Sequence, residues 1–264
     1  MIRLSTFGPV TRFDIARTLL GRGRYWTTAY LVDGLLIDSG CAHEAAGILS
    51  ALRPQPPARL VNTHSHEDHI GADGLLQGHF PGMLIQAHPP VLADPVAPQP
   101  LHPYRRLFWG APAPCLAQPL ADGNLIRTPN FTFQVLFTPG HSPDHLCLFE
   151  PSQGWLFTGD LFVGGRDRAL RQGQDIWQTV RSLQRIAALP LRWLFPGCAR
   201  VREKPIPEIE QKIAYYQAQG AQARKLSEQG LSAAQITRRL CGPPMWVELV
   251  TLGHFSRRNL VTAY

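Results

Sequence analysis

The sequence lacks a run of about 18 apolar residues, the length that a membrane span needs, and its first residues lack the apolar core of a secretory signal. Its five cysteines are odd in number and irregularly spaced, which argues against a disulfide framework and for a reducing compartment. Basic residues form no concentrated stripe, which argues against nucleic acid as a partner. These absences predict a cytoplasmic protein with no membrane association.

What is present is a net charge of +7 and enough hydrophobic residues, 44% of 264, for one large domain with a small extension. The positive charge favours anionic partners in general and does not identify them; the expected partner is a small-molecule substrate, which an anionic group would suit. Strand and helix patterns alternate along the chain, which indicates a layered α/β architecture. We expect strands at 28–32, 35–38, 83–87, 131–137, 145–149, 155–158 and 193–195, and helices at 43–52, 176–189 and 208–229.

Two segments differ from this alternation. Residues 89–119 hold nine of the 24 prolines together with Tyr104, Phe108 and Trp109, which predicts an irregular excursion that is either a substrate lid or a simple cover. From residue 207 onward the pattern is mainly helical, with Ser232 as the expected N-cap of a short helix. We therefore predict a catalytic domain at 1–206 and a mainly helical C-terminal extension at 207–264 that packs on it.

The strongest chemical signal is the run from Thr63 to His69, which contains three histidines and one aspartate directly after a predicted strand. Side chains alternate along an extended segment, so His64 and His66 share one side and can converge on one ion. Asp68 and His69 follow where the chain turns, which can direct them to a second point. Surface histidines on a solvated loop are the alternative, but short histidine-rich tracts indicate metal binding.

Two later junctions add candidate ligands to this run. His141 follows a predicted strand after the turn Pro139-Gly140, and Asp160 follows another strand after Gly159. Glycine permits the abrupt turn at the first junction and a close backbone approach at the second. Each strand is therefore expected to deliver one ligand to the same rim of the fold.

With these residues in view, the chain resembles the metallo-β-lactamase-fold hydrolase superfamily, including its glyoxalase II-like members. The motif H-x-H-x-D-H is matched by His64, His66, Asp68 and His69, and the resemblance extends over nearly the whole chain. Further matches are the turn Asp38-Ser39-Gly40, the P-G-H motif at His141, the G-D motif at Asp160 and a late P-G-H position at Pro196-Gly197-Cys198.

The resemblance implies a fold and a ligand set. The implied fold is a four-layer αββα sandwich with a dinuclear metal site on the common edge of its two sheets. His64, His66 and His141 would hold the first metal, Asp68 and His69 the second, and Asp160 would bridge the two.

Cys198 departs from the motif because it stands where the family usually has the last histidine of the second site. A thiolate is a good zinc ligand, so Cys198 can complete this site. The alternatives are that it leaves the second site weak or empty, or makes it sensitive to oxidation.

The ligand set predicts hydrolysis by a metal-bound hydroxide, because paired divalent ions lower the pKa of a bridging water to near neutrality. Asp68 is the predicted catalytic residue, which would orient the hydroxide and accept its proton. Zinc, two ions per chain, suits these donors, although iron or manganese can occupy similar sites. The predicted substrate is a small ester, thioester or lactone. The alternatives are a phosphodiesterase or nuclease of the same fold, and a redox-responsive metal-binding scaffold with weak hydrolysis.

Two further candidates, Asp38 and His145, have alternative roles. Asp38 can hold a ligand imidazole through its free N–H or tie down the turn at Ser39-Gly40, and the turn is favoured here. His145 can support a metal ligand or make an ordinary structural hydrogen bond.

Several other residues have a functional and a plainer interpretation. Arg166 and Arg168 can bind an anionic substrate or be solvated surface residues. Tyr25 and Trp26 can line the pocket mouth or belong to the core. His254 is expected to pack the final helix.

Overall fold

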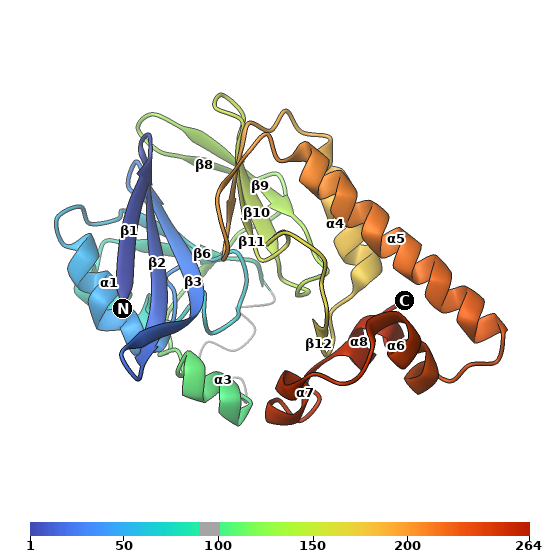
Figure 1. Ribbon diagram of the computed structural model, residues 1–264. Coiled ribbons are helices and arrows are strands. Elements are labelled where there is room, and N and C mark those ends of the chain that lie inside the picture. Colours follow the sequence, from blue (N-terminus) through green and yellow to red (C-terminus); the bar gives the residue numbers. More distant parts are fainter. Residues whose placement is uncertain (90–100) are drawn as a thin grey trace.

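The computed structural model describes residues 1–89 and 101–264, which form a sandwich of two sheets with helices outside each (Figure 1). The first sheet has seven strands in sequence order, antiparallel from the first to the fourth and parallel from the fourth to the seventh. These strands are β1 (Ile2–Phe7), β2 (Val10–Leu19), β3 (Arg22–Val32), β4 (Leu35–Ile37), β5 (Arg59–Val61), β6 (Leu84–Ala87) and β7 (Gln118–Pro119).

The second sheet has six strands in the order β14-β13-β11-β10-β9-β8. All of its pairs are antiparallel except β11 with β13, which run parallel because helix α4 (Ile176–Ala187) connects them. The strands are β8 (Leu125–Arg127), β9 (Thr132–Phe137), β10 (Leu146–Glu150), β11 (Trp155–Gly159), β13 (Trp193–Pro196) and β14 (Arg202–Glu203).

Hydrophobic side chains fill the space between the two sheets and beneath the helices on each outer face. Phe133 and Phe157 from the second sheet meet Val61 and Ile37 from the first in one buried cluster. The outer face of the first sheet packs under α1 (Ala45–Leu52), which follows a short 3-10 turn at Ala42–Glu44, and under α2 (Asp73–His79). The layer order is therefore αββα, as the resemblance implied.

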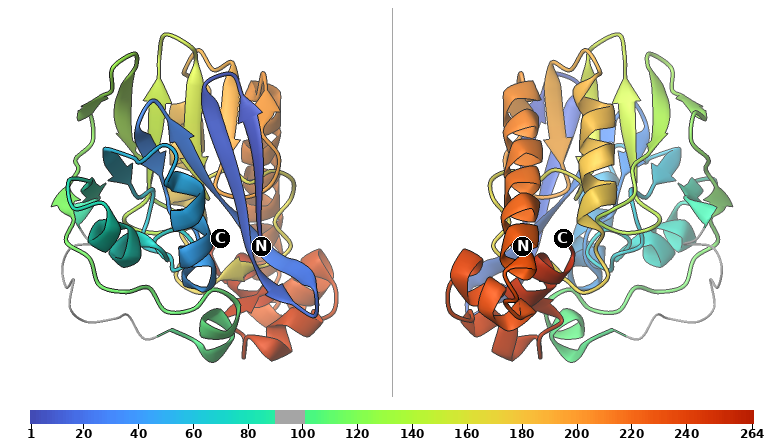
Figure 2. Two further views of the ribbon diagram at one scale, coloured as in Figure 1. Left: turned by 90° about the vertical axis from the view of Figure 1, so that its left-hand side faces the viewer. Right: turned by 90° about the vertical axis from the view of Figure 1, so that its right-hand side faces the viewer.

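Helices α4 and α5 (Ile206–Glu228) lie side by side over the second sheet (Figure 2). Asp175 caps α4 by accepting a hydrogen bond from the backbone of Gln178, and the helix is amphipathic, with one apolar face on the sheet. Ile209 and Tyr216 of α5 belong to the same buried cluster as the second sheet. The boundary between a catalytic domain and an extension at residues 206 and 207 stays a prediction, because α5 shares a hydrophobic core with the second sheet.

The remaining C-terminal residues form α6 (Ala233–Cys241), α7 (Trp246–Val250), β15 (Phe255–Ser256) and α8 (Arg257–Thr262). Ser232 caps α6 in a capping box with Gln235, as the sequence predicted. Strand β15 pairs with β12 (Leu170–Arg171), which lies in the loop after β11. This pairing joins the C-terminal segment to the part of the chain that follows Asp160. No helix among residues 1–89 and 101–264 is long and apolar enough to cross a membrane.

The predicted strands and helices are confirmed, with bounds that differ by a few residues. The β1–β2 hairpin was missed; β1 is exposed or half-buried throughout, and its apolar alternation is limited to Ile2 and Leu4. The proline-rich excursion contains α3 (Pro103–Phe108) and β7, while its residues 90–100 lie outside the described part of the chain.

Candidate metal centre

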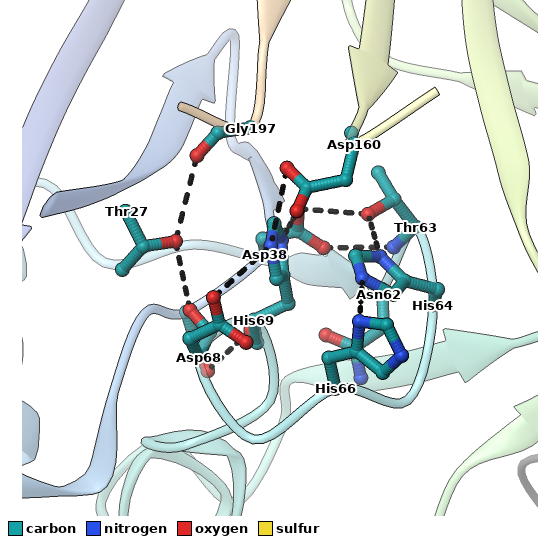
Figure 3. Close-up of polar contacts among 12 residues, drawn as sticks. Thr27, Asp38, Asn62, Thr63, His64, His66, Asp68, His69, Asp160 and Gly197 are labelled. Carbon is teal, nitrogen blue, oxygen red and sulfur yellow. Dashed lines mark hydrogen bonds and ion pairs between the residues drawn. The ribbon is translucent and has the colours of Figure 1, made fainter. Parts of the chain in front are cut away.

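Five of the seven predicted ligands, His64, His66, His69, His141 and Asp160, converge at one edge of the sandwich, where strands of both sheets end. Figure 3 labels four of them, all except His141. The run from His64 to His69 follows β5, His141 lies in the loop between β9 and β10, and Asp160 directly follows β11. The topology thus brings together ligands from both sheets, as the strand-end positions predicted.

Three imidazole nitrogens form the first donor group. His66 Nδ1 lies 2.8 Å from His64 Nε2 and 3.0 Å from His141 Nε2. Burial and neighbouring imidazoles hold the pKa values of His64 and His66 well below the usual range, and burial lowers that of His141 to about 3. The three rings are therefore neutral at pH 7, and neutral imidazole is the form that ligates a metal.

His64, His69 and Asp160 form the second donor group. His69 Nε2 lies 3.6 Å from Asp160 Oδ1 and 3.8 Å from Asp68 Oδ2, while Asp160 Oδ2 lies 3.7 Å from His141 Nε2. Asp160 therefore reaches toward both groups, which is the position predicted for a bridging ligand. Neither Asp68 nor Cys198 joins either group of donors.

Two atoms of this second group are buried without a hydrogen-bond partner, His69 Nε2 and Asp160 Oδ1. Buried polar atoms are normally satisfied, so an orphaned nitrogen and an orphaned carboxylate oxygen facing each other fit a cation between them. Electrostatics agree: although burial lowers the pKa of His69, the carboxylates of Asp38, Asp160 and Asp68 raise it well above the usual range. Positive charge is favoured at this point.

Asp38 makes hydrogen bonds to two residues of the loop that carries the ligands, Thr63 and His69. The expectation that it ties down its own turn was therefore wrong. Asp38 Oδ2 lies 2.7 Å from His69 Nδ1, and its Oδ1 accepts a 2.7 Å hydrogen bond from the backbone of Thr63. Thr63 Oγ1 also donates to Asp38, which leaves this hydroxyl oxygen to accept from His64 Nδ1 at 3.0 Å. Both imidazoles are thereby oriented with Nε2 toward the donor groups.

His145 supports the backbone of Asp160. It is fully buried, its Nδ1 lies 3.0 Å from Thr138 Oγ1, and its Nε2 accepts a 3.2 Å hydrogen bond from the Asp160 amide. A Cβ on Gly159, which has φ +45°, would lie 2.8 Å from that same His145 nitrogen. The close approach predicted at Gly159 is therefore present.

Cys198 lies beside two predicted ligands. Burial raises the pKa of its thiol well above the usual range, and the carboxylates of Asp160 and Asp68 raise it further. A bound cation would reverse this effect, because a metal deprotonates a coordinating thiol. Ligation by Cys198 stays a prediction.

The arginines that the sequence singled out do not reach the centre, and two others do. Arg166 is exposed over the ring of Tyr215, and Arg168 is exposed. Arg171 of β12 instead donates from Nη1 to His66 Nε2, and Arg105 of α3 pairs with the buried Glu67. Sequence reasoning had no signal for either residue, because both lie outside the strand ends that carry the motifs.

Helix α3 packs beside the centre, where Arg105 Nη2 lies 3.9 Å from Asp68 Oδ1. The Tyr25 ring lies 4.1 Å from that of Phe108, so Tyr25 meets α3, whereas Trp26 lies beneath Arg3. His254 was expected to pack the final helix, but its ring stacks on His102 at 3.8 Å and its Nδ1 lies 2.8 Å from the Tyr104 hydroxyl.

Comparison with known proteins bears on this centre. The family model described as the metallo-beta-lactamase superfamily matches residues 23–198, which contain all seven predicted ligands. A hydroxyacylglutathione hydrolase from Aeromonas hydrophila is 35% identical over 157 residues, covering 59% of this chain and 52% of the relative. An atrochrysone carboxyl ACP thioesterase from Aspergillus fumigatus is 27% identical over 188 residues, covering 68% of this chain and 51% of the relative.

The chain thus spans about half the length of these two curated relatives. Among solved structures, a protein crystallised in a di-iron-bound form is 31% identical and has a TM-score of 0.55. That match covers 74% of this chain and 96% of the other.

Proposed function

Because the chain belongs to the metallo-β-lactamase superfamily, we propose that it is a metal-dependent hydrolase of a small thioester or related ester. The observation that carries the proposal is the convergence of three neutral imidazoles beside an orphaned His69 nitrogen and an orphaned Asp160 oxygen. The names of the two curated relatives, a hydroxyacylglutathione hydrolase and a thioesterase, favour a thioester over a lactone or phosphodiester.

The proposed cofactor is a pair of divalent ions. His64, His66 and His141 would hold one ion, Asp68 and His69 the other, and Asp160 would contact both, with Cys198 as a seventh ligand. Zinc suits a set of imidazole, carboxylate and thiol donors. The relative solved with two irons supports a pair of ions and keeps iron as the alternative metal.

Bound ions supply Lewis acidity, which polarises a scissile carbonyl and lowers the pKa of a water toward neutrality. The protein must then hold the water and accept its proton. Asp68 is suited to this task by its position, because its carboxylate lies 3.8 Å from His69 Nε2, beside the second donor group. Thr27 Oγ1 donates to the backbone oxygen of Asp68 at 2.9 Å and so fixes the loop that carries this carboxylate.

A cytoplasmic location belongs to the same proposal and rests on five free cysteines, two of them fully buried. Nothing in the proposal requires a nucleic-acid or membrane partner.

The experiment is a substrate panel of thioesters, esters, lactones and phosphodiesters, assayed with the wild type and the Asp160→Ala and Asp68→Asn variants. We expect thioester hydrolysis that both variants lose. Asp122→Asn serves as a control, because this exposed carboxylate pairs with Arg185 away from the centre. Thioester hydrolysis that persists in Asp160→Ala, or a wild type active only on phosphodiesters, would refute the proposal.

A further inference from the structure

Arg171 is a half-buried arginine beside the candidate metal centre that has no anionic partner. Its guanidinium donates to His66 Nε2, and no carboxylate among the described residues lies within 4.0 Å of it. The neighbouring Arg105 is different, because Glu67 is paired with it. Arg171 therefore brings one unneutralised positive charge to the edge of the donor groups.

Once a metal is bound, His66 can no longer accept the hydrogen bond that Arg171 donates. This part of the inference rests on the proposed function. His66 Nδ1 is the nitrogen that faces His64 and His141, so it is the ligating atom. A neutral imidazole that ligates through Nδ1 carries its proton on Nε2. A guanidinium has donors only, so it cannot hydrogen bond to that N–H, and Arg171 then requires an acceptor from elsewhere.

Tyr104 and His254 are aromatic side chains near Arg171. Tyr104 of α3 and His254, which precedes β15, meet through the 2.8 Å contact between hydroxyl and Nδ1. Figure 1 shows that β12, α3 and the segment with α7 lie at the same end of the molecule. Burial, together with the nearby His102 and Arg171, lowers the pKa of His254 to about 4, so this ring adds no charge at neutral pH.

The single positive charge of one free guanidinium balances a monoanion better than a phosphate dianion. Its two parallel N–H donors fit the two oxygens of a carboxylate. Only the width of the His66 ring separates Arg171 from the nitrogens that converge on the metal position. We propose that Arg171 binds a carboxylate a few bonds from the scissile carbonyl, so that the preferred substrates are thioesters that carry such a carboxylate.

The test compares substrates that differ only in this charge, the succinyl thioester of N-acetylcysteamine and its methyl ester. We expect the wild type to prefer the acid. Arg171→Gln should raise the KM for the acid by about 10- to 100-fold, the usual effect of losing a charge-assisted pair, and leave the methyl ester nearly unchanged. Arg166→Gln removes the same charge from an exposed position and should change neither substrate.

A binding measurement keeps the test independent of turnover. The ketone analogue, in which CH2 replaces the thioester sulfur, is titrated calorimetrically as the acid and as its methyl ester. A preference for the acid that Arg171→Gln abolishes and Arg171→Lys partly retains supports the proposal. Equal binding of acid and ester by the wild type overturns it, as does an equal loss for both ligands in either variant, because that would indicate a structural role.

The two proposals fail differently. A wild type that binds the acid analogue selectively but hydrolyses no thioester refutes the proposed activity alone. A wild type that hydrolyses acid and ester equally well refutes the carboxylate site alone.

Discussion

Replacing Asp38 by Asn tests whether the carboxylate beneath His69 controls the second ion. Asp38 is 2% exposed and makes three short contacts, at 2.7 Å to His69 Nδ1, 2.7 Å to the Thr63 amide and 2.9 Å to Thr63 Oγ1. All three partners are donors, so the NH2 group of Asn would face at least one of them. Asn is the appropriate variant because Asp38 has φ +58°, a conformation that Asn tolerates better than Ala.

The structure sets the expected magnitude. One lost charge-assisted hydrogen bond, with a donor left buried, should lower the free energy of unfolding by about 1.5–3 kcal/mol. Loss of a supporting contact to a metal-binding histidine typically costs about 10- to 100-fold in affinity, and here that loss should fall on one ion only. The affinity for the ion held by His64, His66 and His141 should change little. Asp38 influences this group through Thr63, which orients His64.

The assay is a zinc titration against a chromophoric chelator, which resolves the two dissociation constants, together with urea unfolding of the metal-free protein. Asp122→Asn is the matched control, because Asp122 also accepts a backbone hydrogen bond, from Phe137, but is exposed and forms its ion pair with Arg185 and not with a predicted ligand. Equal weakening of both ions, or no weakening of either, would refute the reasoning.

Three further predictions concern the backbone at Gly159, the buried ion pair of Lys212 and the thiol of Cys198. Gly159→Ala should abolish metal binding, because its Cβ would lie 2.6 Å from a threonine oxygen at φ +45°; retention of both ions in a metal titration would contradict this. Lys212→Met should lower the free energy of unfolding in urea by about 1.5–3 kcal/mol, since it strips Asp167 of a buried partner at 3.1 Å. Arg200→Gln, which removes an exposed pair, should cost less than about 1 kcal/mol, and equal losses would refute the distinction. Cys198→Ala should lower the affinity for one of two ions; an unchanged titration would show that the thiol is no ligand.

Much of the fold and of the candidate metal centre could be predicted because the relevant signals are local. His64, His66, Asp68 and His69 are neighbours in one loop, and a strand before the loop fixes where they lie. The same reasoning failed for Asp38, because a carboxylate in a turn can hydrogen bond locally or across the fold. Only the folded structure shows that it reaches His69, 31 residues further along the chain.

Contacts that depend on distant pairing could not be predicted. Arg171 reaches His66 because β12 pairs with β15 near the C-terminus, and a two-residue strand has no detectable period. Tyr104 meets His254 for the same kind of reason, across 150 positions of the chain. The side of the centre where we propose that the substrate binds is therefore built from segments whose sequence patterns carry little information.

The most direct test of the central claim is thioester hydrolysis during removal and measured restoration of zinc, with metal content determined by mass spectrometry. We expect the metal-free protein to be inactive, and its activity to rise in proportion to the binding of up to two ions per chain. Full hydrolysis by protein that retains no metal would contradict it.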